Sequence, residues 1–144
     1  MGLVYADITI INAKDILFAE DGYLPKNKIR QITSTMLVDS GAYMMAINQD
    51  MKAQLGLKSK KSQIAQLADG QVIDLEVVGP IEVIFENRSC IVEAFVLPGN
   101  SEPLLGAIPM EYMDVLIHRN DESPQQNKLI VNPAHPIIAQ LKMK

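Results

Sequence analysis

The chain has 144 residues, a net charge of −4 and 48% hydrophobic residues, while aromatic residues make up only 5%. This length predicts one domain spanning residues 1–144 with a sizeable core. Because Lys and Arg are scattered, aromatic residues are few and no apolar run approaches the ~20 residues of a membrane span, we expect no nucleic-acid partner and no membrane partner.

The N-terminus predicts neither secretion nor lipid attachment. Residues 1–7 lack the basic segment of a signal peptide, and Ala6 stands where myristoylation at Gly2 needs Ser or Thr. Cys90 is the single cysteine, which excludes an internal disulfide and suits a reducing compartment. We therefore expect a cytoplasmic protein.

Strand signals come first along the chain. Residues 3–11 are rich in Ile, Val and Thr and predict a strand. Asp21-Gly22 and Pro25 indicate a turn or loop. Residues 29–38 alternate loosely and predict a second strand, which leads directly into Asp39.

A short helix is expected next. Asn48 is a suitable N-cap, Met51 and Leu55 have i, i+4 spacing, and Gly56 fits the C-terminal end. The basic run at 58–61 predicts a solvated loop rather than a binding surface.

The second half of the chain predicts mainly strands. Asp69-Gly70 is a strong hairpin turn signal, and residues 86–88 form a second expected turn. Pro109 fits the first turn of a helix. The expected strands are 63–67, 71–77, 81–86, 89–97 and 129–131; the helix carries Met110, Met113 and Leu116; residues 119–127 form a loop, and Pro133 and Pro136 follow the last strand.

Leu37-Val38-Asp39-Ser40-Gly41-Ala42 carries the strongest functional signal. Two β-forming residues lead into an acid, a hydroxyl residue, a glycine and a small residue. Gly41 permits a sharp turn and close approach of a ligand, and the Ser40 hydroxyl can brace that turn. An aspartic peptidase needs a carboxylate held in this way at a strand end. A second hydrophobic–hydrophobic–glycine element, Leu104-Leu105-Gly106, lies downstream of it.

With these motifs the chain resembles the retropepsin-like aspartic peptidases, in particular small bacterial members in which the domain stands alone. The matching segments are Val38–Ala42 (catalytic motif), Gln66–Gln71 (flap), Val96–Gly99 and Glu102–Gly106 (second half-motif), and Val131–Pro136 (tail). The resemblance implies a mainly β fold, a single-lobe acid-protease barrel with a flap hairpin and one or two short helices. It also implies an active-site loop of Ser40, Gly41 and Ala42, a substrate-binding flap of Leu67, Ala68, Asp69, Gly70 and Gln71, and a second half-motif of Leu104, Leu105 and Gly106.

The expected activity is that of an aspartic endopeptidase at mildly acidic to neutral pH, with a peptide or protein substrate and no cofactor or metal. Hydrolysis needs two carboxylates that share a proton, and the sequence contains one Asp-Ser-Gly. We therefore expect a C2 homodimer with Asp39 of each copy at the axis. The retroviral enzymes imply the same arrangement.

The chain departs from the retroviral pattern at the expected dimer contact. Retroviral enzymes pair a basic residue just after the second-motif glycine with an acid four positions beyond the catalytic aspartate. Here these positions hold Ala107 and Tyr43, so no unpaired charge is left behind. We expect an apolar contact through Tyr43, Met44 and Met45.

Other interpretations remain open from the sequence. Asp69-Gly70 also suits an ordinary hairpin, Gly106 an ordinary strand end, and the whole chain a catalytically silent dimerisation or peptide-binding module on the same fold. His118, His135 and Cys90 have no zinc-site spacing, and Ser40 lacks the G-x-S-x-G frame of a serine hydrolase. Cys90 is expected to be a core thiol in a strand, and Asp114 to face solvent.

Overall fold

Strands predominate in the computed structural model, which describes residues 3–136, and this confirms the predicted mainly β fold. The Gly2 prediction lies outside the described residues. The strands are β1 (Tyr5–Asn12), β2 (Gln31–Val38), β3 (Met45–Asn48), β4 (Ser59–Gln66), β5 (Val72–Phe85), β6 (Arg88–Leu97), β7 (Leu104–Leu105), β8 (Val115–His118) and β9 (Lys128–Val131). The helices are α1 (Ala13–Glu20), α2 (Gln49–Leu55) and α3 (Ala107–Met113), with 3₁₀ turns η1 (Lys26–Lys28) and η2 (Pro124–Gln126).

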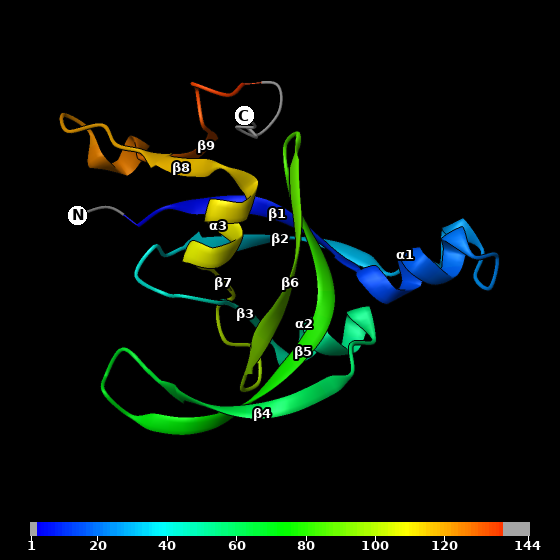
Figure 1. Cartoon of the computed structure of the whole chain (residues 1–144). Coiled ribbons are helices and arrows are strands. Elements are labelled where there is room, and N and C mark those ends of the chain that lie inside the picture. Colours follow the sequence, from blue (N-terminus) through cyan, green and yellow to red (C-terminus); the bar gives the residue numbers. More distant parts are fainter. Residues whose placement is uncertain (1–2, 137–144) are drawn as a thin grey trace, which may run out of the picture.

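Seven strands form one sheet in the order β1-β2-β7-β3-β6-β5-β4 (Figure 1). β1 also pairs with β5, so the sheet curls back on itself and closes into a barrel. β4 remains outside this closure, hydrogen-bonded to β5 alone within the sheet. The edge of β4 that faces away from β5 is therefore free within the sheet. β8 and β9 form a separate antiparallel pair.

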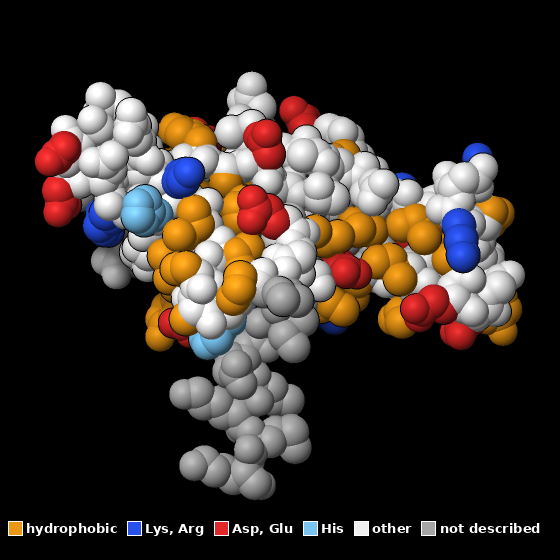
Figure 2. Space-filling view, turned by 90° about the horizontal axis from the view of Figure 1, so that it is seen from above, with side chains coloured by type: hydrophobic (Ala, Val, Ile, Leu, Met, Phe, Trp, Pro, Cys, Tyr) orange, Lys and Arg blue, Asp and Glu red, His pale blue; other side chains and the backbone are white. Residues whose placement is uncertain are grey.

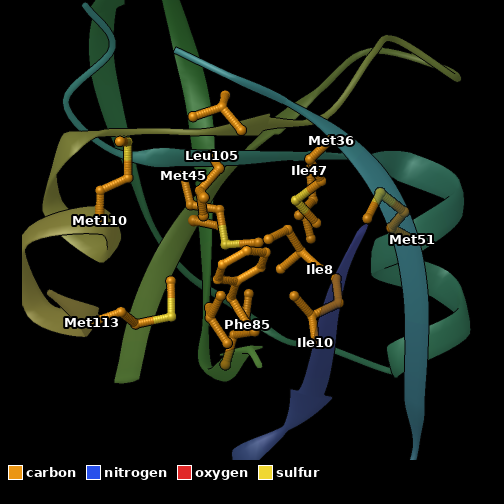
Figure 3. Packing of buried hydrophobic residues seen from close by; sticks show 14 of the residues in the cluster. Ile8, Ile10, Met36, Met45, Ile47, Met51, Phe85, Leu105, Met110 and Met113 are labelled. Atoms are coloured by element: carbon orange, nitrogen blue, oxygen red, sulfur yellow. The ribbon is translucent and has the colours of Figure 1, made fainter. Parts of the chain in front are cut away.

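The interior of the barrel is filled with aliphatic and methionine side chains from nearly every strand (Figure 3). Ile8, Ile10, Met36, Met45 and Ile47 are fully buried, and Phe85 and Leu105 pack beside them. Alternation explains this set, because residues two apart on a strand face the same side. α3 adds Met110 and Met113 to one side of this core.

Helix α1 was not expected from the sequence. Asn12 caps it, since its side chain accepts a hydrogen bond from the Asp15 N–H at 3.1 Å. Asp15 in turn receives the Arg30 guanidinium at 2.8 and 2.9 Å, and this ion pair lowers the pKa of the Asp15 carboxyl. An Asn followed three residues later by an acid was the signal that sequence reasoning missed.

Three other predictions about elements were wrong. The strands expected at 71–77 and 81–86 are one continuous strand, β5, which accommodates Gly79-Pro80 at an irregularity in its pairing with β6. Residues 59–61 of the basic run lie in strand β4, not in a loop, with their side chains exposed. Leu116 belongs to strand β8 because helix α3 ends at Met113. The helix at 49–55, the strand at 88–97 and the last strand were predicted correctly.

Asp114 does not face solvent freely, contrary to expectation. It ends α3 in the left-handed conformation, and its carboxylate accepts a hydrogen bond from Asn132 Nδ2 at 3.1 Å and lies 2.6 Å from His135 Nδ1. The buried Arg88 guanidinium lies 3.9 Å away and also donates to the His135 carbonyl. The Asn132 hydrogen bond, followed by that of His135, lowers the pKa of Asp114. We call Arg88, Asp114, Asn132 and His135 the Asp114 cluster; it holds the segment after β9 against α3.

Seen from above, α1 forms one end of the molecule and the β8–β9 pair lies toward the other (Figure 2). Hydrophobic side chains are visible over both halves of this face, with acidic side chains scattered between them. Among the helices of residues 3–136, none is long and apolar enough to span a membrane.

Candidate active site

Asp39 lies immediately after β2, at the point where this strand leaves the barrel. β2 pairs in parallel with β7, matching Leu37 with Leu104 and Val38 with Leu105. The pairing extends to Asp39 itself, whose N–H donates to the Leu105 carbonyl at 2.9 Å. The two sequence motifs, far apart along the chain, are therefore adjacent strands of one sheet.

The loop after Asp39 is a tight turn held by backbone groups. The Gly41 N–H donates to Asp39 Oδ1 at 2.9 Å, and the Ala42 N–H donates to the Asp39 carbonyl at 3.1 Å. The expected brace from Ser40 is absent: among residues 3–136 its hydroxyl has no hydrogen-bond partner, and the residue is exposed. The backbone N–H of Gly41 thus orients the carboxylate, and the second carboxylate oxygen stays available.

Gly106 and the first residues of α3 clamp the other end of this loop. The Ala107 N–H donates to the Ala42 carbonyl at 2.7 Å, and the Ile108 N–H donates to the Tyr43 carbonyl at 2.9 Å. A Cβ at Gly106 would overlap the Met44 carbonyl and lie 2.8 Å from the Tyr43 carbonyl oxygen. Only a glycine allows this approach, so the backbone of the Asp39 loop is fixed from both sides.

A cleft of about 850 Å³ opens in front of Asp39. Of the described residues that line it, Asp39 is the single one with a charged side chain. The others are mostly apolar and come from the Asp39 loop, β3, β4, the turn between β4 and β5, β5, β6, β7 and α3. They include Ala46, Leu75, Phe95, Leu97, Leu104 and Ile108.

The predicted hairpin is present between β4 and β5, and its tip borders the cleft. The Leu67 N–H donates to the Gln71 carbonyl at 2.8 Å, and the Asp69 carboxylate accepts from the Gln71 N–H at 2.9 Å. Gly70 adopts φ 87°, which favours glycine. Figure 1 shows this tip and the loop after β2 on the same side of the barrel.

Strand β4 presents its edge to the cleft. Four successive residues, 63–66, line the cleft, although neighbouring side chains of a strand point to opposite faces. All four residues can border the cleft because it is the backbone of β4, rather than one face of its side chains, that lies along it. The edge is unpaired within the sheet, so its N–H and C=O groups can accept an extended peptide as an added strand.

The structure brings some of the expected site residues together and separates others. Asp39, Gly41, Ala42 and Leu104 line the cleft along with Leu67, Ala68 and Gly70 of the hairpin tip. Ser40, Asp69, Gln71, Leu105 and Gly106 do not line it; they support its walls or lie outside. Sequence reasoning missed Phe95 and Leu97, which alternation along the expected strand 89–97 would have placed on one face.

The expected apolar contact at Tyr43, Met44 and Met45 needs correction. Tyr43 is 79% exposed, whereas Met45 is fully buried in the core and cannot reach a partner. Met44 is half-buried and lines the cleft. The exposed apolar group beside Asp39 is therefore Tyr43.

The remaining nucleophilic and metal-binding groups do not form a second centre in the described chain. Cys90 is half-buried in β6 beside the core, and burial raises the pKa of its thiol to about 11, as suits an inert core thiol. No group of three or more His, Cys, Asp or Glu within residues 3–136 could hold a metal ion.

Comparison with known protein families supports the arrangement around Asp39. Residues 26–110 match the family model described as gag-polyprotein putative aspartyl protease. The match runs from η1 to the beginning of α3 and so includes Asp39, the hairpin and Gly106. No individually curated protein matches the chain.

Proposed function

The chain belongs to the gag-polyprotein aspartyl protease family, and from this premise we propose that it is an aspartic endopeptidase that works as a homodimer. The observation that carries the proposal is the cleft itself. It is large enough for a peptide, mostly apolar, and lined by one carboxylate among the described residues.

One carboxylate cannot perform this chemistry alone. The reaction uses one carboxylate as general base toward water and a second carboxylic acid to protonate the oxygen of the scissile carbonyl. Since Asp39 is the acid of the cleft, we propose that a second copy supplies its own Asp39 across a two-fold axis. The pair then shares one proton.

The geometry around Asp39 suits this role. The Gly41 N–H fixes one carboxylate oxygen and leaves the other directed to the reactants. In the proposed cycle, one Asp39 removes a proton from water as the water attacks the scissile carbonyl. Its mate donates a proton to the carbonyl oxygen, and collapse of the tetrahedral intermediate passes a proton to the leaving amine.

The β4–β5 hairpin is proposed to act as the flap. The substrate peptide lies extended between the Asp39 loop and β4, pairing with the free β4 edge while its side chains enter the apolar cleft. Closure of the tip, residues 67–71, excludes water from the reacting bond.

The proposal is tested with purified full-length protein and an unfolded protein substrate between pH 4 and pH 7.5. We expect cleavage that Asp39→Asn slows by about 10²-fold or more without loss of folding. Equal cleavage by Asp39→Asn overturns the assignment of the catalytic residue. Absence of cleavage together with tight binding of extended peptides points to the silent peptide-binding module on the same fold.

A further inference from the structure

A second groove, of about 420 Å³, lies beside α3 and adjoins the cleft. Met44 and Ile108 line both spaces, so the groove and the cleft are neighbours that share a wall. The remaining walls come from the beginnings of β3 and β4, the interiors of β5 and β6, and α3. They are Met45, Lys60, Pro80, Ile91, Val92, Glu93, Pro109 and Tyr112.

The walls of this groove carry large apolar side chains that are exposed to solvent. Ile91 is 59% exposed and Tyr112 is 67% exposed, on β6 and α3 respectively. Neither residue lines the cleft around Asp39. An apolar side chain placed between them would remove apolar surface of both partners from water.

Strand β4 connects the groove with the cleft. Its residues 63–66 border the cleft, and Lys60, near its beginning, borders the groove. A peptide that pairs with the free edge of β4 would therefore extend from the cleft, at residues 63–66, toward the groove at Lys60. At about 3.3 Å per residue, the five or so residues between these points cover roughly 17 Å.

The charges at the groove favour a peptide with acidic character at its outer end. Lys60 and Lys61 lie 3.7 and 3.8 Å from the two oxygens of Glu93, so two ammonium groups share one carboxylate. These groups are partly exposed, and each pair is therefore weak. The net positive charge can still attract and orient a carboxylate of the substrate.

We propose that the groove is an outer subsite for the same peptide substrate, taking an apolar side chain roughly five residues from the cleaved bond. This inference rests on the proposed peptidase function and adds a substrate class to it: extended peptides with an apolar outer residue and an adjacent acid. We infer a substrate peptide as the occupant because the groove shares the wall of Met44 and Ile108 with the cleft, and because strand β4 borders both spaces.

The test compares peptides with one central sequence. A short peptide ends about three residues from the cleaved bond. Long peptides extend either end by about three residues, so that Leu-Glu or Ser-Gln occupies about the fifth and sixth positions. For the wild-type chain we expect the Leu-Glu extension at one end to raise kcat/KM about tenfold, mainly through KM. The Ser-Gln extension should give little gain.

Tyr112→Ser and Ile91→Ser should each remove most of the gain from the long peptide. Leu116→Ser is the matched control, since Leu116 is an exposed apolar residue of β8 that lines neither space, and it should keep the full gain. An extension that gives no gain, or a gain that both groove variants retain, overturns the proposal. A change of oligomeric state in Tyr112→Ser would also overturn it, because the groove would then belong to a contact between copies.

A binding experiment tests the groove even if the chain is not a peptidase. If no peptide is cleaved, binding of fluorescently labelled short and long peptides to the same chains is measured by anisotropy. Tighter binding of the Leu-Glu peptide that depends on Ile91 and Tyr112 then supports the groove, and equal binding of the short and long peptides rejects it.

Discussion

Asp39 and Asp114 both lie where a regular element ends, but their carboxylates are used differently. Asp39 accepts one hydrogen bond, from the Gly41 N–H, and faces an open apolar cleft. Asp114 has both oxygens engaged, by Asn132 and His135, with Arg88 close by. A carboxylate whose oxygens are both held by its own chain fixes structure, whereas one with an oxygen to spare is available for chemistry.

Replacing each aspartate by asparagine tests this difference between Asp39 and Asp114, and the larger effect is expected at Asp39. Asp39→Asn should reduce peptide hydrolysis by about 10²- to 10⁴-fold, since it removes the general acid–base group. Its stability should stay within about 0.5 kcal/mol of wild type because the Gly41 N–H keeps an oxygen acceptor. Initial cleavage rates and urea unfolding measure the two effects. A large loss of stability with unchanged hydrolysis would give Asp39 the role we assign to Asp114.

Tyr43→Asp tests whether the exposed surface beside Asp39 contacts a second copy of the chain. A charge at this 79% exposed position should weaken the proposed dimer roughly 10- to 100-fold, because two like charges would meet near the axis. Hydrolysis should fall at low protein concentration and recover at high concentration.

The matched control for this substitution is Tyr23→Asp. Tyr23 is 81% exposed and follows α1. Figure 1 shows α1 and the loop after β2 at opposite ends of the molecule. Sedimentation velocity should show an unchanged dimer for Tyr23→Asp. If Tyr43→Asp also leaves the dimer intact, the contact between copies lies elsewhere.

Substitution of two glycines distinguishes two roles. Gly106 supports the backbone of the Asp39 loop, and Gly41 orients the Asp39 carboxylate. Gly106→Ala should destabilise the fold by roughly 1–3 kcal/mol, since the added Cβ meets the Met44 and Tyr43 backbone. In Gly41→Ala the Cβ meets only Asp39 Oδ1, at 3.2 Å, so we expect a stability cost below about 0.5 kcal/mol but a clear loss of kcat. Urea unfolding and kinetics of both variants provide the check; equal stability costs would contradict the proposed clamp.

The smallest expected effect is the pH dependence of Asp114→Asn. The pKa of Asp114 is lowered in the folded chain, first by Asn132 and then by His135, so its ionised form stabilises the fold. That contribution is fully present above the ordinary carboxyl range and is lost as pH falls below about 4, through the lowered pKa. The variant should melt a few degrees below wild type at pH 7, and the gap should close in acid.

Asp121→Asn is the control for this pH experiment, because Asp121 is an exposed loop residue. Its melting temperature should follow that of wild type at every pH. A gap between wild type and Asp114→Asn that persists unchanged at low pH would show that the carboxylate charge is not what holds the Asp114 cluster.

Part of this picture was accessible from the sequence, for local reasons. The turn at Asp39, the hairpin at Asp69-Gly70 and the helix capped by Asn48 depend on residues within a few positions of one another. The parallel pairing of β2 with β7 was not accessible, because β7 has two residues and shows no periodicity. Asp114 was misread because its partners Asn132 and His135 lie 18 and 21 residues further along.

The central claim, that one active site uses Asp39 from two copies, is tested most directly by mixing chains. Wild-type protein is co-refolded with a roughly ninefold excess of Asp39→Asn, and hydrolysis per wild-type chain is measured. Because most wild-type chains then occupy mixed dimers with one carboxylate, we predict that activity falls to about one tenth. Unchanged activity per wild-type chain in this mixture, with mixed dimers demonstrated, would contradict the shared site.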